Sequence, residues 1–213
     1  MKQSAVTTTS NRQQRAFWLK HLHQWHWISA AISLVAMLLF AATGITLNHA
    51  AQIEARPKVE SHQAQLPDAM LERLTQLGLE GEHALPQDLQ DWLSQQFPLK
   101  LGQRLGEWSK EEIYVALPRP GGDAWLNIDL LSGEIEYEVT ERGWVSYFND
   151  LHKGRHTGVA WSWFIDLFAV ASLIFGISGL FLLHLYGGNR PATWPLVGLG
   201  VVIPVVLLVL FVH

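Results

Sequence analysis

The segment WSWFIDLFAVASLIFGISGLFLLHL (161–185) is apolar along nearly its whole length and holds a single acidic residue, Asp166. Two further segments, 27–47 and 193–212, are equally apolar and contain no acidic residue, lysine or arginine. Each of the three has about 20 residues, which is enough for a helix to cross the roughly 30 Å hydrocarbon core of a bilayer. The sequence therefore predicts three transmembrane helices and excludes a soluble globular enzyme.

The composition supports a membrane protein and excludes several other classes of protein and of site. Only 16% of the 213 residues are charged, whereas a soluble domain has roughly 25%. The absence of cysteine excludes disulfides, thiolate zinc sites, iron–sulfur clusters and cysteine nucleophiles. A net charge of −4 gives no basic face, so we expect no nucleic-acid partner. No hydrolase or nucleotide-binding motif is present, and we predict no catalytic residue.

The distribution of charge predicts the orientation in the membrane. Basic residues precede the first apolar segment and, as Arg190, follow the second, which indicates that both positions are cytoplasmic. We therefore expect an uncleaved anchor and a multi-pass protein of the bacterial inner membrane, with the N-terminus cytoplasmic and the central domain and C-terminus periplasmic. The basic residues before the first segment are Lys2, Arg12, Arg15 and Lys20.

The region between the first two apolar segments reads as one small α+β domain. Helical periodicity is present in 66–79 and 85–97, and alternating patterns typical of strands occupy 111–118, 124–130 and 134–140. The predicted fold is an α-helical membrane protein with three transmembrane helices and one small extracytoplasmic α+β domain between helices one and two. The predicted segments are a polar cytoplasmic tail (1–20), transmembrane helix one (21–49), the periplasmic domain (50–144), an outer histidine segment with transmembrane helix two (145–186), a cytoplasmic turn (187–192) and transmembrane helix three (193–213). Within the tail, residues 1–15 are expected to be disordered.

Histidines gather at both ends of the first two predicted transmembrane helices. Because these helices cross the bilayer in opposite directions, packing them together brings the inner histidines level with one another, and likewise the outer ones. Facing imidazoles in a helical bundle are a common way of ligating haem iron. The inner candidates are His23, His26 and His184, and the outer candidates are His49, His152 and His156.

Helical phase adds an acidic residue to the candidate site. At about 100° per residue, His152, Asp166 and His184 fall within roughly 40° of one another and form one stripe on a continuous helix. An acid inside a membrane helix is a candidate functional group, here as a proton relay or for tuning a haem. The alternative is a helix-packing residue paired with Lys153 or Arg155.

Two other interpretations of the histidines stay open. Histidine and tryptophan both favour the membrane–water interface, so the histidines would belong to an interfacial belt with the neighbouring tryptophans. The motif HKGRH (152–156) has i, i+4 spacing, which on a helix would let His152 and His156 chelate a divalent metal. Gly154 weakens a helix at this position, and no third ligand is close in sequence.

Three stretches resemble PepSY-associated transmembrane proteins. They are LHQWHWISAAISLVAMLLFAATGITLNHA (22–50), FNDLHKGRHTGVAWSWFIDLFAVASLIFGISGLFLLHLY (148–186) and the strand–turn–strand WLNIDLLSGEIEYEV (125–139), which is similar to the end of a PepSY domain. Relatives in this group are inner-membrane haem b proteins, among them ferrisiderophore reductases. The resemblance implies one or two haem b groups, with ligands drawn from His23 or His26, His49, His152 or His156, and His184.

The resemblance also implies a function. The chain would be an oxidoreductase component in the bilayer that passes electrons from a quinol or membrane donor to a periplasmic redox protein or ferric chelate. Those reductases have at least four spans, and no flavin or NAD(P)H fingerprint is present here, so the donor would be external. A homo-oligomer is expected because three helices are a thin scaffold for two haems. The alternative is a haem-free, membrane-anchored PepSY binding or regulatory module.

Overall fold

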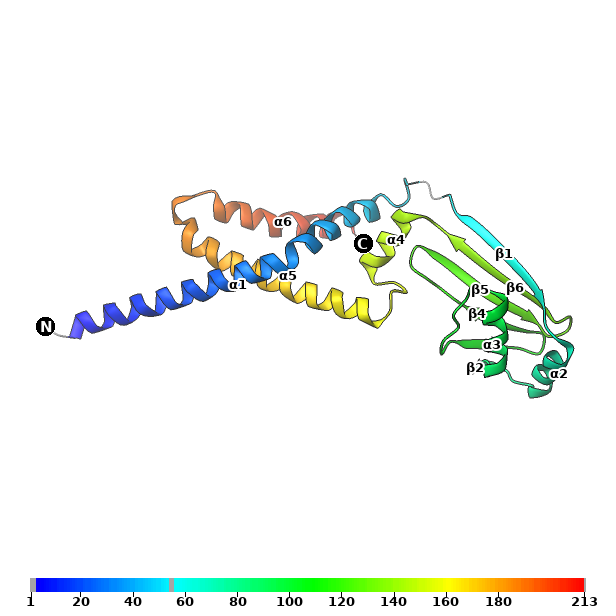
Figure 1. Cartoon of the computed structure of the whole chain (residues 1–213). Coiled ribbons are helices and arrows are strands. Elements are labelled where there is room, and N and C mark those ends of the chain that lie inside the picture. Colours follow the sequence, from blue (N-terminus) through cyan, green and yellow to red (C-terminus); the bar gives the residue numbers. More distant parts are fainter. Residues whose placement is uncertain (1–2, 54–55, 213) are drawn as a thin grey trace. The chain divides into compact units, whose positions relative to one another are not determined.

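A computed structural model describes residues 3–53 and 56–212 of the chain (Figure 1). It forms two compact units, which are described separately. The helical unit comprises 1–39 and 163–213, and the sheet unit comprises 40–162. Lys2 and the C-terminal His213, which enter the prediction of orientation, lie outside the described residues.

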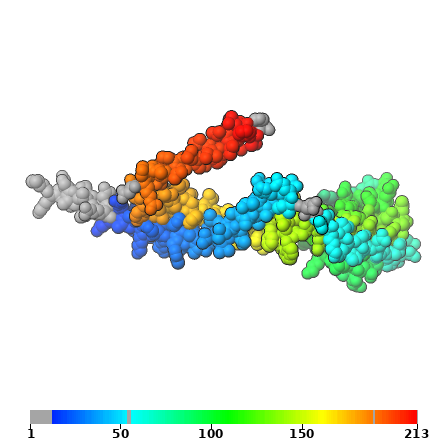
Figure 2. Space-filling model, turned by 90° about the horizontal axis from the view of Figure 1, so that it is seen from above, coloured from blue at the N-terminus to red at the C-terminus, as the bar shows by residue number. Residues whose placement is uncertain are grey.

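Three helices are long and apolar enough to cross a membrane, as the sequence predicts. None of the residues of the third is buried, and it extends as a separate rod in the space-filling view (Figure 2). A helix that is apolar on all sides is suited to a lipid environment. The helices are α1 (Gln3–Asn48), α5 (Val159–Tyr186) and α6 (Thr193–Phe211), with a short 3-10 turn (Gly187–Asn189) before α6.

The beginning of the chain differs from the expected disordered tail. Helix α1 begins at Gln3 and continues without interruption to Asn48. No glycine or proline precedes Gly44, and the residues of the tail include good helix formers such as glutamine, arginine and alanine. Propensity therefore permits the helix to extend well beyond the apolar segment.

The sheet unit contains a six-stranded antiparallel sheet with the strand order β1-β6-β5-β4-β3-β2. The three strands and two helices predicted from the sequence are confirmed as β4, β5, β6, α2 and α3. Strand β1 was not predicted because its sequence, KVESHQAQ, is polar on both faces. The elements are β1 (Lys58–Gln65), α2 (Asp68–Leu77), β2 (Gly81–Ala84), α3 (Gln87–Gln96), β3 (Leu105–Trp108), β4 (Glu112–Ala116), β5 (Gly122–Asp129) and β6 (Glu134–Glu141).

One face of this sheet carries the hydrophobic core. Alternate residues of the central strands, such as Leu126 and Ile128 on β5, are fully buried against leucines of α2 and α3. Leu93 of α3 is one of these leucines. Burial of one such side chain contributes about 1.5–3 kcal/mol to the stability of the fold. The other residues of each strand point to the opposite face. Among the described residues, no helix adds buried core residues on that face.

A separate helix, α4 (Trp144–Lys153), links the sheet to α5. It ends at Gly154, which is left-handed with φ of 66°, and α5 does not begin until Val159. His152 therefore does not belong to the helical stripe predicted for it with Asp166 and His184. His152 lies at the end of α4 and His156 lies in the following turn with φ of 58°, so they do not share a helical face.

Candidate functional site

The inner candidate histidine, His26 on α1, packs directly on α5. Its ring stacks on Phe175 with centroids 4.6 Å apart and planes 18° apart. Its Nδ1 lies 3.1 Å from Oγ of Ser178 and 3.2 Å from the carbonyl oxygen of Phe175. A Cβ added at Gly179 would lie 3.3 Å from Cε1 of His26, so this glycine permits the close approach of the ring.

The outer candidate, His152 on α4, packs on α1 in a comparable way. Its ring lies 4.7 Å from that of Phe40 at an angle of 38°. Its Nδ1 lies 2.6 Å from Oγ1 of Thr43. Gly44 follows immediately, and a Cβ added there would meet Cε1 of His152 at 3.9 Å.

The two receiving surfaces share a sequence pattern. FAATG (40–44) and FGISG (175–179) both read Phe-x-x-(Ser/Thr)-Gly. Residues three and four apart lie on one face of a helix, so each pattern presents an aromatic ring, a hydroxyl and a glycine to one histidine. The small residues in both stretches are visible in the sequence, but their use requires knowing which histidine lies opposite. The recurring pattern is the signal that would have identified both surfaces.

Hydrogen bonds orient both rings. Ser178 Oγ also lies 3.1 Å from the carbonyl oxygen of Phe175, and Thr43 Oγ1 lies 3.1 Å from that of Phe40. Nδ1 of His26 contacts the Phe175 carbonyl oxygen as well, which can only accept, so Nδ1 carries the hydrogen and Nε2 of this ring has the lone pair. The hydroxyl of Thr43 can donate to or accept from Nδ1 of His152, so this contact fixes the orientation of the ring. Histidines that bind metals are commonly held in this way, with the second nitrogen donating to a protein oxygen.

His23 and His49 are oriented by their own helix. Nδ1 of His23 lies 2.8 Å from the carbonyl oxygen of Leu19, and Nδ1 of His49 lies 2.9 Å from that of Ile45. A carbonyl can only accept, so in these rings too Nε2 carries the lone pair. Both side chains are exposed, and His23 also contacts the ring of Tyr186 on α5.

The remaining candidates lie on exposed positions. His184 of α5 contacts the ring of Trp194 edge-on at 5.7 Å. Asp166 is also exposed and is 18 residues, or five turns at about 100° per residue, before His184, so both are on one face of α5. His152 does not share this stripe because α4 is a separate helix. Within the described residues, no group of three metal-binding side chains of the histidine, cysteine or carboxylate type is present.

The register between neighbouring helices decides which histidines lie at the same height along the helix axes. In the sheet unit, Thr46 donates to Oδ1 of Asn149 at 2.7 Å, one turn beyond the Thr43–His152 contact. His49 is six residues past Thr43, about 9 Å further along the axis, so it is not level with His152. The structure therefore brings His152 level with Thr43 and not with His49.

The inner level is different. His23 contacts Tyr186 with ring centroids 5.7 Å apart, and Tyr186 is two residues from His184. His23 therefore lies close to the level of His184. His26 lies deeper along α1 and faces Ser178, about two turns from His184 along α5.

The open face of the sheet is strongly acidic. Strand pairing places Tyr114 and Trp125 there as a stacked pair, with centroids 6.4 Å apart. Trp125 Nε1 donates to Glu138 Oε1 at 3.2 Å. Within the described strands the only lysine or arginine is Lys58, which lies on the other face, beside Glu141 in the strand register, and forms an ion pair with Glu60. The acidic residues on the open face are Glu82, Glu107, Glu112, Asp123, Asp129, Glu134, Glu136 and Glu138.

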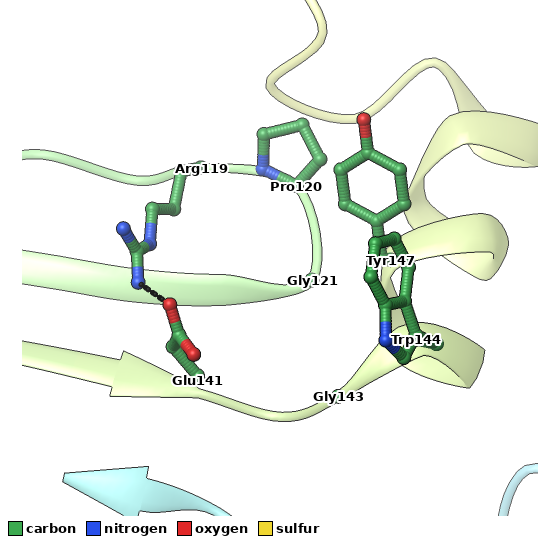
Figure 3. A pocket seen from close by; sticks show the side chains of 7 residues that line it. All are labelled: Arg119, Pro120, Gly121, Glu141, Gly143, Trp144 and Tyr147. Carbon is green, nitrogen blue, oxygen red and sulfur yellow. Dashed lines mark hydrogen bonds and ion pairs between the residues drawn. The ribbon is translucent and has the colours of Figure 1, made fainter.

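A shallow hollow of about 540 Å³ lies where the sheet meets α4 (Figure 3). On one side Arg119 forms an ion pair with Glu141 at 3.0 Å. On the other side Trp144 and Tyr147 project from α4. None of the residues that line the hollow is a histidine.

Three membrane-length helices and an antiparallel sheet domain define the chain as a multi-pass membrane protein associated with a lipid bilayer. A family model described as "Putative PepSY_TM-like" matches residues 17–213. The chain therefore belongs to this PepSY-associated transmembrane family. No curated protein and no solved structure matches the chain.

Proposed function

We propose that the protein is a haem b electron-transfer component of the bacterial inner membrane. The observation that carries this proposal is the repeated arrangement of His26 on FGISG (175–179) and His152 on FAATG (40–44). In each, Nδ1 of a histidine is held by a hydroxyl beside an aromatic ring and a glycine. Interfacial histidines have no need of a dedicated aromatic and hydroxyl surface.

The donor set is suitable for haem iron. Imidazole nitrogen is a standard axial ligand, and an oriented Nδ1–H makes Nε2 a better donor. Bound haem would supply one-electron redox chemistry. In this proposal His26 and His152 each provide one ligand, and the remaining imidazoles come from the same chain or a second copy in a homo-oligomer. The residues available for that role are His23, His49, His156 and His184.

The chain's own residues would then hold and shield the cofactor. Ser178 and Thr43 keep each ring from rotating, and the phenyl groups of Phe175 and Phe40 limit access of water to one side of it. Asp166, on the face of α5 shared with His184, is a candidate for a proton relay or for tuning a haem potential.

In this proposal the electron acceptor docks on the sheet domain. Its acidic open face attracts a positively charged acceptor, and Trp125 with Tyr114 offers flat aromatic surface at its centre. With the N-terminus cytoplasmic, the domain is periplasmic, and electrons pass from a quinol or membrane donor to a periplasmic redox protein or a ferric chelate. This makes the protein an oxidoreductase component without its own nucleotide site.

A histidine replacement series tests the ligand assignment. His26→Ala and His152→Ala should each remove a haem from the purified full-length protein, measured by pyridine haemochrome per chain. His21→Ala is the matched control, because His21 lies on the same helix, contacts only Phe17 among the described ring pairs, and is no candidate ligand. The same assay on His49→Ala and His184→Ala identifies the second ligands. Unchanged haem content in both His26→Ala and His152→Ala would overturn the assignment.

A second candidate function is a haem-free, membrane-anchored binding or regulatory module. The acidic open face favours it independently, since a docking surface needs no cofactor. This function predicts that the domain binds its partner when α1 and α5 are exchanged for unrelated anchors. The electron-transfer function predicts that such a chimera loses all redox activity.

A further inference from the structure

Helix α4 has its apolar and polar faces reversed relative to a helix of a soluble domain. Its two buried residues, Asn149 and Asp150, are polar, whereas Trp144 is 75% exposed and Phe148 is 48% exposed. A helix in water normally buries its apolar stripe. The arrangement on α4 therefore requires an apolar environment outside the sheet unit.

The buried polar residues explain how α4 is held in this orientation. Asp150 Oδ2 accepts from the backbone N–H of Gly121 at 2.9 Å, which ties α4 to the start of β5. Asn149 accepts from Thr46 at 2.7 Å, which ties it to α1. These contacts fix the inward face of α4, and the aromatic residues are left on the outward face.

The exposed aromatic residues form one cluster. Ring centroids of Trp144 lie 5.9 Å from Tyr147 and 6.2 Å from Phe148, and those of Tyr147 and Phe148 lie 5.8 Å apart. Figure 3 shows Trp144 and Tyr147 projecting side by side from α4. Together with the exposed Val145 they give α4 a continuous apolar surface. We call these four residues the α4 aromatic face.

Side-chain contacts join α4 to the ends of the two membrane-length helices α1 and α5. Trp161, in the first turn of the membrane-length helix α5, donates from Nε1 to the carbonyl oxygen of Leu151 at 2.9 Å. On the other side, His152 contacts Thr43 in the last turns of the membrane-length helix α1. Helix α4 is therefore joined at its C-terminal end to the ends of two transmembrane helices, within a single compact unit.

The chemistry of α4 and its flanks fits a lipid interface. Tryptophan and tyrosine prefer the headgroup level of a bilayer, where one part of the ring is apolar and the other is wet. Arg142 precedes the helix and the exposed Lys153 and Arg155 end it, which suits phospholipid phosphates. We propose that the α4 aromatic face lies in the phospholipid interface of the bilayer that α1 and α5 cross, and so anchors the sheet unit on the membrane surface.

The absence of cysteine makes a direct test possible. Single cysteines are introduced as Trp144→Cys, Val145→Cys or Phe148→Cys in the full chain, spin-labelled, and reconstituted in phosphatidylcholine–phosphatidylglycerol vesicles. Collision with oxygen, which concentrates in lipid, is compared with collision with a water-soluble nickel chelate. Retention of the elution volume of the unaltered protein shows that each variant is folded.

Leu131→Cys is the matched control. Leu131 is a large apolar residue of the same unit with 76% exposure, in the turn after β5. The eight residues of β5 span about 27 Å and separate Leu131 from the end of the sheet that contacts α4. We expect the oxygen-to-nickel collision ratio at the α4 positions to exceed that at Leu131 severalfold. Equal ratios would overturn the proposal, and so would labels shielded from both reagents, which would indicate a protein partner or a second copy on this face. Neither result would bear on haem binding.

Discussion

Oγ1 of Thr43 lies 2.6 Å from Nδ1 of His152, and this contact joins α4 to the last turns of α1. Ser178 holds His26 in the same way at 3.1 Å. In both pairs the hydroxyl also lies 3.1 Å from the carbonyl oxygen three residues earlier on its own helix. The two contacts are thus equivalent in chemistry, although they join different helices.

Replacement of Thr43 should separate the role of this hydrogen bond from the role of packing. Thr43→Val keeps the shape of the side chain and removes the hydroxyl, and we expect a loss of about 1 kcal/mol in the free energy of unfolding. The measurement is thermal or urea unfolding in detergent, within a double-mutant cycle with His152→Ala. Thr75→Val is the control, because that hydroxyl bonds only within α2, to Leu71 at 2.9 Å. Additive effects of the two replacements would contradict the coupling.

A second prediction concerns the contact between α4 and the sheet. Gly121 has φ of 72°, and a Cβ there would lie 2.7 Å from Cβ of Tyr147. Gly121→Ala therefore incurs both backbone strain of about 1–2 kcal/mol and overpacking of about 1–3 kcal/mol. Gly102→Ala incurs the strain alone, because Gly102 has φ of 58° and open space around it. Unfolding measurements should show the larger loss for Gly121→Ala, and equal losses would argue against close packing of α4.

Much of this fold could be predicted from the sequence because its signals are local. Apolar length identified three transmembrane helices, and strict alternation identified β4, β5 and β6. Strand β1 escaped prediction because it lies at the sheet edge with polar residues on both faces. The end of α4 at Gly154 also escaped, since a glycine alone does not show whether a helix bends or stops.

The histidine sites could be predicted only as a set of residues. Which histidine meets which surface depends on the register between helices, and the periodicity of one helix carries no information about its neighbour. The calculation of helical phase that placed His152 and Asp166 on one face assumed an unbroken helix. The left-handed Gly154 ends α4 between these two residues, so the calculation does not apply. The placing of His49 opposite His152 failed for the same reason.

The turn between β5 and β6 makes stability dependent on pH. Backbone N–H groups of Ser132 and Leu131 donate to Asp129, and these hydrogen bonds lower the pKa of its carboxyl group. A lowered folded pKa contributes stability that is present above the unfolded pKa of about 3.9 and is lost as pH falls through the folded value.

Asp129→Asn should therefore destabilise the protein at pH 7, and the difference from the unaltered chain should shrink on acidification below about pH 4. Unfolding curves at a series of pH values provide the measurement. Glu111→Gln, an exposed substitution in the preceding β3–β4 turn, serves as the control. A difference that stays constant with pH would show that the carboxylate does not hold the turn.

The acidic open face makes a prediction about docking. Glu136→Lys combined with Glu112→Lys should slow association with a basic redox protein and reduce the dependence of its rate on ionic strength, because electrostatic steering is lost. Stopped-flow kinetics at several salt concentrations would measure this. Glu72→Lys on α2, which packs on the opposite face of the sheet, should have a smaller effect. Equal effects at both faces would point to net charge rather than a docking surface.

The central claim is that this membrane protein carries haem b on paired histidine surfaces. The most direct test is a reduced-minus-oxidised spectrum of the full-length protein, expressed with haem supply and purified in mild detergent, with pyridine-haemochrome quantification. The account predicts low-spin b-type bands and one or two haems per chain. A folded, colourless protein would contradict it and leave the membrane-anchored binding module as the function of the chain.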